Sequence, residues 1–253
     1  MKQAYWIITK DFDVALVNGE IPFGCADDVQ LSGRNFLTIG ELNGFPVHLV
    51  QADVRDEMRN FAFLRTLIAK PEANLLHRAV SLSQFLQSHR FCGRCAAPLH
   101  LAESEIALAC EACGHRIYPT ISPSIIVAVR KGRQILLANH QRHKGGIYTT
   151  LAGFVEAGEP IEQTVQREVW EESGLKIRNI RYFGSQPWSF PHSLMLGFLA
   201  DYDSGEIKLQ ESELCDARWF DCDEPLPELP PKGTIALALI EATLALCRTE
   251  SPL

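Results

Sequence analysis

The segment from Gly153 to Leu175 holds the chain's densest collection of side chains that could do chemistry. It reads GFVEAGEPIEQTVQREVWEESGL, which is the pattern G-x5-E-x7-R-E-V-x-E-E-x-G-L. Carboxylates this close together raise one another's pKa and take up protons unless a cation lies among them. Hard divalent ions such as Mg²⁺ and Mn²⁺ prefer oxygen ligands. The segment therefore predicts a divalent-metal site that bridges carboxylates to an anionic phosphate and acidifies an attacking water.

A helix over residues 160–173 is expected to position these carboxylates. Proline suits its first residue because the missing N–H would have no partner there, and Gly174 suits the left-handed position past its end. At about 100° per residue, Glu168 and Glu172 fall on the same side of the helix, spaced i and i+4. They lie beside an apolar stripe formed by Ile161, Val165 and Val169. Both carboxylates should therefore face inward, with Glu171 at the margin of the stripe.

The composition indicates a folded cytoplasmic protein without a membrane partner. With 253 residues and 46% hydrophobic content, the chain can bury a substantial core. Its net charge of -7 argues against a general affinity for nucleic-acid backbones. The N-terminal MKQAYWIITKDFD has too short an apolar run for a secretory signal, and no stretch reaches the ~18 apolar residues of a membrane helix.

Four of the eight cysteines follow the spacing C-x2-C-x14-C-x2-C: Cys92, Cys95, Cys110 and Cys113. Two such pairs are typical of a zinc ribbon, in which four thiolates complete the metal's coordination and leave no position for catalysis. We therefore expect one structural Zn²⁺ per chain. Disulfides are the alternative, disfavoured in a reducing compartment, and a redox CxxC would need only one pair.

The remaining sequence predicts three domains. Short alternating runs such as AYWIIT and FPVHLV predict a small sheet, and a helical pattern follows over residues 71–90. We assign residues 1–90 to an N-terminal α+β domain rich in strands, 91–119 to the ribbon and 120–253 to a catalytic domain. In this last domain, strand-like runs alternate with helices, which predicts an α/β/α sandwich around a mixed sheet.

A second informative segment runs from Ser185 to Ser193 and reads SQPWSFPHS. Two prolines stiffen it, and Trp188 and Phe190 offer flat faces. Such a loop can hold a base or a nicotinamide ring by stacking, which contributes about 1–3 kcal/mol per base. A packed turn is the alternative, since prolines and aromatic residues are common in turns.

These features together resemble a known enzyme family. The segment at residues 153–175 resembles the Nudix box residue for residue, and the order of ribbon, box and SQPWxFPxS is similar to the NADH pyrophosphatase subfamily of Nudix hydrolases. The likeness covers residues 88–250. It implies hydrolysis of NAD(H) to nicotinamide mononucleotide and AMP, and some members of the subfamily also remove NAD caps from the 5′ end of RNA. It further implies a homodimer.

The resemblance also implies individual roles. The catalytic residues would be Arg167, Glu168, Glu171 and Glu172, with Arg167 and Glu159 bracing loop against helix. The Mg²⁺ or Mn²⁺ ligands would be the carbonyl of Ala152 with Glu168, Glu172 and Glu213. The substrate-binding residues would be Glu105, Tyr118, Phe154, Gln186, Pro187, Trp188, Ser189, Phe190, Pro191, His192, Ser193 and Ala236, with Tyr118 and Phe154 flanking a ring. The general base varies among Nudix enzymes and stays open.

Two positions depart from the subfamily's pattern. Ser189 stands where the motif usually has a second internal proline, and His192 stands where other small polar residues occur. Losing a proline is expected to loosen the loop through chain entropy. In the N-terminal half, Arg65 is a candidate for a substrate-binding arginine, but no pattern anchors that alignment and a surface position is favoured.

Two competing functions and one structural alternative remain open. The first is a Nudix hydrolase that prefers ADP-ribose or another nucleotide sugar. The second is a non-catalytic protein in which a zinc ribbon and a degenerate Nudix fold bind nucleotide or RNA, although all of the box glutamates are present. The third is a solvated glutamate face with Arg167 as an intrahelical partner, which the complete pattern disfavours.

Overall fold

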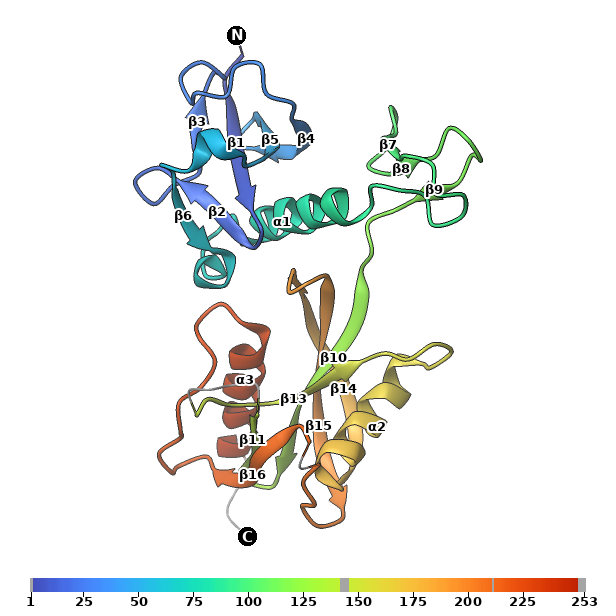
Figure 1. The fold of residues 1–253 in the computed structure, drawn as a ribbon. Coiled ribbons are helices and arrows are strands. Elements are labelled where there is room, and N and C mark those ends of the chain that lie inside the picture. Colours follow the sequence, from blue (N-terminus) through green and yellow to red (C-terminus); the bar gives the residue numbers. More distant parts are fainter. Residues whose placement is uncertain (1, 142–145, 211, 250–253) are drawn as a thin grey trace. The chain divides into compact units, whose positions relative to one another are not determined.

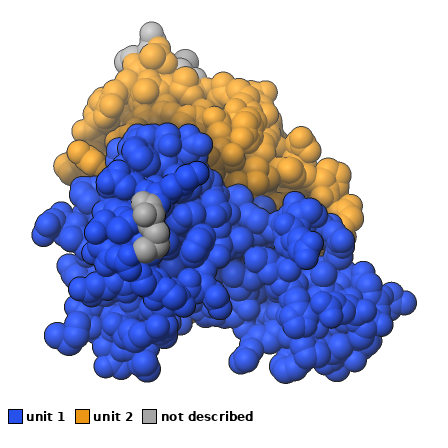
Figure 2. All heavy atoms as spheres, turned by 90° about the horizontal axis from the view of Figure 1, so that it is seen from above, with its two compact units in different colours: residues 1–121, 187–192 blue, residues 122–186, 193–253 orange. Residues whose placement is uncertain are grey.

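The computed structural model divides the chain into two compact units (Figure 2). It describes residues 2–141, 146–210 and 212–249. Unit 1 contains residues 1–121 together with the short segment Pro187–His192, and unit 2 contains residues 122–186 and 193–253. The segment Pro187–His192 is therefore separated in sequence from the rest of its unit.

Unit 1 begins with the predicted small sheet. Its strands are β1 (Ala4–Lys10), β2 (Asp13–Leu16), β3 (Phe23–Gly24), β4 (Leu37–Leu42), β5 (Phe45–Gln51) and β6 (Asn60–Phe63). They are arranged in the order β4-β5-β1-β2-β6, with β3 beside β1, and only β1 and β5 run parallel. Two 3₁₀ helices, η1 (Val54–Asp56) and η2 (Leu64–Leu67), flank β6.

Helix α1 (Ala73–Ser88) covers one face of this sheet (Figure 1). The predicted helix over residues 71–90 is thus confirmed, with ends two residues shorter on each side. Its buried apolar side chains pack on those of the strands, and this cluster includes Ile7, Val14, Leu49, Leu76 and Val80. Two polar side chains of the helix, His77 and Ser83, are buried as well.

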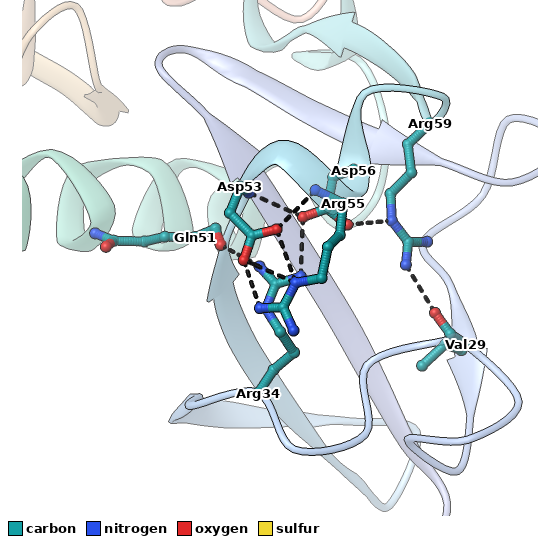
Figure 3. Close-up of polar contacts among 7 residues, drawn as sticks. All are labelled: Val29, Arg34, Gln51, Asp53, Arg55, Asp56 and Arg59. Atoms are coloured by element: carbon teal, nitrogen blue, oxygen red, sulfur yellow. Dashed lines mark hydrogen bonds and ion pairs between the residues drawn. The ribbon is translucent and has the colours of Figure 1, made fainter.

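An ion cluster lies where the chain leaves the end of β5 and enters η1 (Figure 3). The Asp56 carboxylate, 2% exposed, accepts hydrogen bonds from Arg34 Nη1 at 3.0 Å and Arg59 Nε at 2.6 Å. Burial raises the pKa of Asp56, but the Asp53 backbone N–H and the two guanidinium groups outweigh it and lower the pKa overall. Asp53 also caps η1 by accepting from Arg55 N. Charge pairing therefore holds the loop at residue 34 against η1.

The ribbon completes unit 1 with a small antiparallel sheet. Its strands are β7 (His100–Leu101), β8 (Leu108–Ala109) and β9 (Arg116–Ile117). The two cysteine pairs lie in the turns next to these strands. Each turn is closed by backbone hydrogen bonds, Ala96 N to Cys92 O and Gly114 N to Cys110 O, both at 2.8–2.9 Å.

Unit 2 contains a seven-stranded mixed sheet. Its strands are β10 (Ser122–Lys131), β11 (Gln134–His140), β12 (Tyr148–Thr149), β13 (Leu151–Phe154), β14 (Lys176–Trp188), β15 (Ser193–Ser204) and β16 (Leu214–Asp221). β10 and β15 run parallel, whereas β10 pairs with β11 and β13, and β11 with β16, in antiparallel fashion. The central strands are thus paired on both sides.

Helices α2 (Ile161–Ser173) and α3 (Ile235–Thr249) lie on opposite faces of this sheet (Figure 1). Alternate residues of β10 decide the two faces: Ile125 and Val127 pack with α2, whereas Ile126 packs with α3. This alternation follows from the two-residue period of a strand. The predicted α/β/α sandwich with a mixed sheet is confirmed.

The ends of α2 agree closely with the prediction. Pro160 is the N-cap with extended backbone (φ -66°, ψ 148°) and lies one position before the first helical residue. Gly174 ends the helix in the left-handed conformation (φ 71°), as predicted, and donates its N–H to Trp170 O. Across residues 2–141, 146–210 and 212–249, no helix has both the length and the apolar character needed to cross a membrane.

The ion cluster of unit 1 yields a prediction for two arginines. Arg34→Ala removes a guanidinium that is 6% exposed and leaves Asp56 buried with one partner fewer, so we expect a loss of about 3 kcal/mol in the free energy of unfolding. Arg55→Ala removes one that is 61% exposed, so its loss should stay below about 1 kcal/mol. Urea unfolding followed by circular dichroism measures both. Equal losses would contradict a stabilising role for the buried pair.

Candidate active site

The apolar stripe of helix α2 packs on the sheet, and two glutamates next to the stripe are buried or partly buried with it. Val165 and Val169 are fully buried against the sheet. Glu172, on the same side, is 1% exposed, and Glu168 is partly buried. Glu171 is exposed at the margin of the stripe. The predicted inward orientation of Glu168 and Glu172 therefore agrees with their burial.

Arg167 connects the glycine loop to the helix. Its Nε and Nη2 donate to the two carboxylate oxygens of Glu159, each at 2.9 Å, which is the bidentate geometry of a strong ion pair. Nη1 donates to Glu168 Oε1 at 2.8 Å and to Glu171 Oε2 at 2.9 Å. Nη2 also donates to the Phe154 carbonyl at 3.0 Å. One guanidinium thus fixes three carboxylates and the backbone of the loop.

The surroundings of Glu159 lower its pKa, whereas those of Glu168 raise its pKa. The Arg167 guanidinium lowers the pKa of Glu159 to about 2, with help from Thr164 Oγ1. Burial raises the pKa of Glu168, and the neighbouring charges of Glu171 and Glu213 raise it further, although Arg167 opposes this shift. Glu168 is therefore a carboxylate that a cation would stabilise in its charged form. The effect of the Glu213 charge on the pKa of Glu168 also indicates that the two carboxylates lie near each other.

Gly153 makes room for the Glu168 carboxylate. Gly153 lies on β13 directly after Ala152, and a Cβ added at Gly153 would overlap the carboxyl group of Glu168. Only a glycine lets this carboxylate lie against the strand. The strand backbone next to Ala152 and the carboxylates of α2 are all hard oxygen donors, so the site fits Mg²⁺ or Mn²⁺.

The four ribbon cysteines form a second metal-binding cluster. Their Sγ atoms all lie within 4.8 Å of one another, with Cys92 and Cys113 at 3.7 Å and Cys95 and Cys110 at 3.5 Å. Tetrahedral Zn²⁺ with bonds of 2.3 Å to sulfur separates its ligands by about 3.8 Å. The cluster is therefore consistent with a structural zinc ion. Both short distances connect one CxxC pair with the other, as a shared ion requires.

The thiols of this cluster shift one another's pKa. The Arg94 backbone N–H, 3.4 Å from Cys92 Sγ, lowers the pKa of Cys92 to about 7. The Ala97 backbone lowers the pKa of Cys95, but the neighbouring thiols of Cys110 and Cys113 outweigh it and raise this pKa to about 12. Four thiolates at this separation repel one another, and a bound divalent ion removes the repulsion.

The aromatic residues of the segment SQPWSFPHS gather around Arg65. Trp188 and Phe190 meet edge to face with ring centroids 5.1 Å apart. The Arg65 guanidinium lies over Phe190 at 5.0 Å and over Trp188 at 5.4 Å. Arg65 is exposed, as expected, yet it belongs to this aromatic group. No described acidic side chain forms an ion pair with it, so its charge is available to an anionic ligand.

Ser189 is held more firmly than the loss of a proline suggested. Its side chain is 1% exposed. Its N–H donates to His77 Nδ1 at 3.2 Å, and its Oγ donates to the His77 carbonyl at 2.9 Å and contacts Ser81 Oγ at 2.7 Å. These hydrogen bonds offset the chain entropy that a proline would remove. The expected loosening of the loop is therefore countered by contacts with α1.

Gln186 connects the end of β14 to the start of α3. Its Oε1 accepts from Ile235 N at 2.8 Å, and its Nε2 donates to Gly233 O at 2.6 Å. Ala236, in the first turn of α3, is buried directly beyond this contact. Ser193 begins β15 and pairs with Ser122. These predicted substrate-binding residues thus lie in unit 2.

The other predicted substrate-binding residues are divided between the units. Tyr118 is exposed in unit 1, and its hydroxyl donates to Glu105 Oε1 at 3.4 Å. Glu105 also pairs with Arg116. Phe154 is exposed at the end of β13 in unit 2. Pro187, Pro191 and His192 complete the loop of unit 1, and the latter two are exposed.

Comparison with known proteins identifies the family. The NUDIX domain model matches residues 120–239, and the NADH pyrophosphatase zinc ribbon domain model matches residues 87–118. The NAD-capped RNA hydrolase NudC of Pasteurella multocida (strain Pm70) is 61% identical over 250 residues, which cover 97% of this chain and 94% of that protein. The chain belongs to the NudC family of Nudix hydrolases.

Further relatives agree with the NudC assignment. The NAD-capped RNA hydrolase NudC of Salmonella paratyphi C (strain RKS4594) is 47% identical over 252 residues, covering 99% of this chain and 96% of that protein. A Nudix hydrolase from Nitrosomonas europaea shares the fold, with a TM-score of 0.50 and 18% identity, and covers 64% of this chain and 94% of its own.

Sequence reasoning missed the contacts of Ser189 with α1. His77 and Ser81 lie on α1 and hold Ser189 more than a hundred positions away. Their local signal is weak: His77 is a polar residue on the mostly apolar buried face of α1, and Ser81 is half-buried one turn further on. Arg65 was a candidate from the sequence, but an exposed arginine after a strand is common, so the sequence could not place it among aromatic rings.

The close approach of Gly153 to Glu168 yields a test of the metal site. Gly153→Ala places a methyl group where the carboxylate lies, so we expect the affinity for Mn²⁺ to fall by about tenfold or more. The fold should persist because the end of a side chain can move. Gly184→Ala is the matched control, since a Cβ at that strand position meets nothing within 4 Å. Calorimetric titration with MnCl₂ compares the two variants, and equal affinities would contradict the assignment of Glu168.

Proposed function

We propose that this chain hydrolyses the pyrophosphate bond of NAD(H), releasing nicotinamide mononucleotide and AMP, and that it removes NAD from the 5′ end of capped RNA. The observation that carries the reaction class is the cluster in which Arg167 braces Glu159, Glu168 and Glu171 beside the buried Glu172. The substrate class rests on the likeness to the NAD-capped RNA hydrolases named NudC, at 47–61% identity over nearly the whole chain.

The proposed catalytic residues act through charge and position. Glu168, Glu172, Glu213 and the Ala152 carbonyl would hold Mg²⁺ or Mn²⁺, which when bound supplies charge neutralisation at the pyrophosphate and a water of lowered pKa. Arg167 keeps Glu168 and Glu171 oriented. One box glutamate accepts the proton of the attacking water.

The dinucleotide's rings and charge would be held by the loop and its neighbours. Trp188 and Phe190 offer faces for stacking, and the exposed guanidinium of Arg65 lies against both rings with its charge available to a phosphate. For Glu105, Tyr118, Phe154, Gln186, Ser193 and Ala236, the substrate-binding roles are carried over from the resemblance. A homodimer in the cytoplasm is part of the same proposal.

The experiment that tests the proposed reaction compares two glutamates of α2. Glu172→Gln removes a buried carboxylate of the box, so we expect kcat for NADH to fall by about a thousandfold or more. Glu162→Gln changes an exposed carboxylate in the first turn and should leave kcat unchanged. Chromatographic detection of nicotinamide mononucleotide and AMP measures both. Parental activity in Glu172→Gln would remove Glu172 from the mechanism.

Substrate comparison separates the proposal from its rivals. The ratio of kcat/KM values among NADH, NAD-capped RNA and ADP-ribose should favour the two NAD compounds. A preference for ADP-ribose would support the nucleotide-sugar hydrolase instead. Retention of RNA without any Mg²⁺-dependent cleavage would support the non-catalytic binding protein.

Removal of one ribbon cysteine tests the structural zinc. Cys110 is buried among the four sulfur atoms, so Cys110→Ser should lose the single zinc ion per chain and lower the melting temperature. Cys215→Ser changes an exposed cysteine outside the ribbon and should keep the zinc. Elemental analysis of the purified variants gives the metal content. Full zinc content in Cys110→Ser would exclude the four-sulfur site.

A further inference from the structure

A buried polar network joins the loop Pro187–His192 to helix α1 within unit 1. Its members are His77 and Ser81, one helical turn apart, and Ser189 of the loop. His77 and Ser189 are almost completely buried. Polar groups in such a place cost free energy unless their hydrogen bonds are satisfied, so the pairing of each proton matters.

The donors and acceptors of this network can be assigned from the hydroxyl and amide protons. The Ser189 N–H donates to His77 Nδ1, so Nδ1 carries no proton and the neutral imidazole is protonated at Nε2, which meets no hydrogen-bond acceptor among the described residues. The single Ser189 hydroxyl proton goes to His77, where the carbonyl at 2.9 Å and the unprotonated Nδ1 at 3.0 Å both accept. Ser189 Oγ therefore accepts from Ser81 Oγ at 2.7 Å. Burial lowers the pKa of His77 to about 4, which agrees with the neutral ring.

The network lies between the two aromatic rings that face the substrate in the proposed function. His77 stacks on Trp188 with centroids 6.2 Å apart and planes at 30°, and it meets Phe190 edge on at 6.1 Å. Ser189 is the residue between these two rings in the chain. Fixing its backbone and side chain therefore fixes the separation of both rings.

The backbone N–H is the part of this network that a proline could not supply. Proline has no N–H to donate, so it would leave His77 Nδ1 buried without a donor. The serine at position 189 and the histidine at position 77 are thus a matched pair. Where the motif has proline, the stiff pyrrolidine ring restricts the loop. In this chain, the hydrogen bonds of Ser189 to α1 restrict it instead.

We infer that His77 and Ser81 are positioning residues of the substrate loop, acting through Ser189 to hold Trp188 and Phe190 for ring binding. This inference rests on the proposed function, because it assigns the loop's rings to substrate. Neither residue touches the reacting phosphates in this scheme. Their loss should therefore raise KM and leave kcat close to the parental value.

The first test compares two serines on the same helix. Ser81→Ala removes a hydrogen bond to the loop, so KM for NADH should rise about fivefold with kcat within about twofold. Ser83→Ala is the control, because Ser83 is buried on α1 but accepts from Thr9 Oγ1 of the sheet at 2.8 Å. It reports general weakening of the helix and should leave KM unchanged. An equal rise in both variants would overturn the inference.

The second test replaces His77, whose Nδ1 accepts the hydrogen bond from the Ser189 N–H. His77→Leu leaves the Ser189 N–H buried without an acceptor, so KM should rise about twentyfold. His77→Asn places an amide oxygen near the position of Nδ1 and should restore KM to within about threefold of the parental value. Failure of asparagine to improve on leucine would contradict a role for the hydrogen bond.

Hydrogen exchange of the loop decides the inference independently of activity. In Ser81→Ala and His77→Leu, peptides covering residues 184–193 should exchange at least about tenfold faster than in the parental protein, and in Ser83→Ala they should not. Unchanged exchange in all three variants would refute the anchoring. If the parental protein fails to cleave NADH, the proposed function fails, and exchange in the loop still reports whether α1 positions it.

Discussion

The site depends on one guanidinium among several carboxylates. Arg167 pairs with Glu159 through two parallel hydrogen bonds and reaches Glu168, Glu171 and the Phe154 carbonyl with its remaining N–H groups. Without that charge, the glycine loop and the helix would present only mutually repelling groups. With it, Glu159 stays ionised as a structural anchor, while burial keeps Glu168 in need of a further cation. The arrangement therefore holds the carboxylates together and still leaves room for a divalent ion.

Packing and catalysis share one face of α2. The apolar residues that attach the helix to the sheet alternate with the glutamates, so the same contacts that stabilise unit 2 also set the depth of Glu172. Gly153 contributes by the absence of a side chain, because Glu168 lies where a Cβ would be. In the ribbon, by contrast, four sulfur atoms would complete the coordination of a bound ion by themselves, which suits a structural role.

Sequence patterns over a few residues predicted the features that depend on short-range interactions. The ends of α2, the cysteine cluster, the small N-terminal sheet and the two-faced sheet of unit 2 all follow from spacing, capping and periodicity. The pairing of His77 with Ser189 does not, because the two residues are 112 positions apart and His77 belongs to no motif. The consequence of having serine in place of proline was only partly predictable for the same reason: chain entropy is a property of the loop, whereas the hydrogen bonds that oppose loosening come from another element. The cation–π contacts of Arg65 likewise cannot be predicted from the sequence, because the rings of Trp188 and Phe190 lie far from it along the chain.

The interrupted course of the chain has a consequence for biosynthesis. Unit 1 takes residues 187–192 from a segment that leaves and re-enters unit 2. A ribosome that adds about 5–20 residues per second therefore exposes the nascent N-terminal unit for several seconds before Ser189 and Phe190 exist. During that interval Phe12, Phe63 and the imidazole of His77 lack the partners that later cover them. Folding of unit 1 is therefore complete only after residues 187–192 have been translated. Premature termination before these residues would release a fragment whose apolar side chains stay exposed.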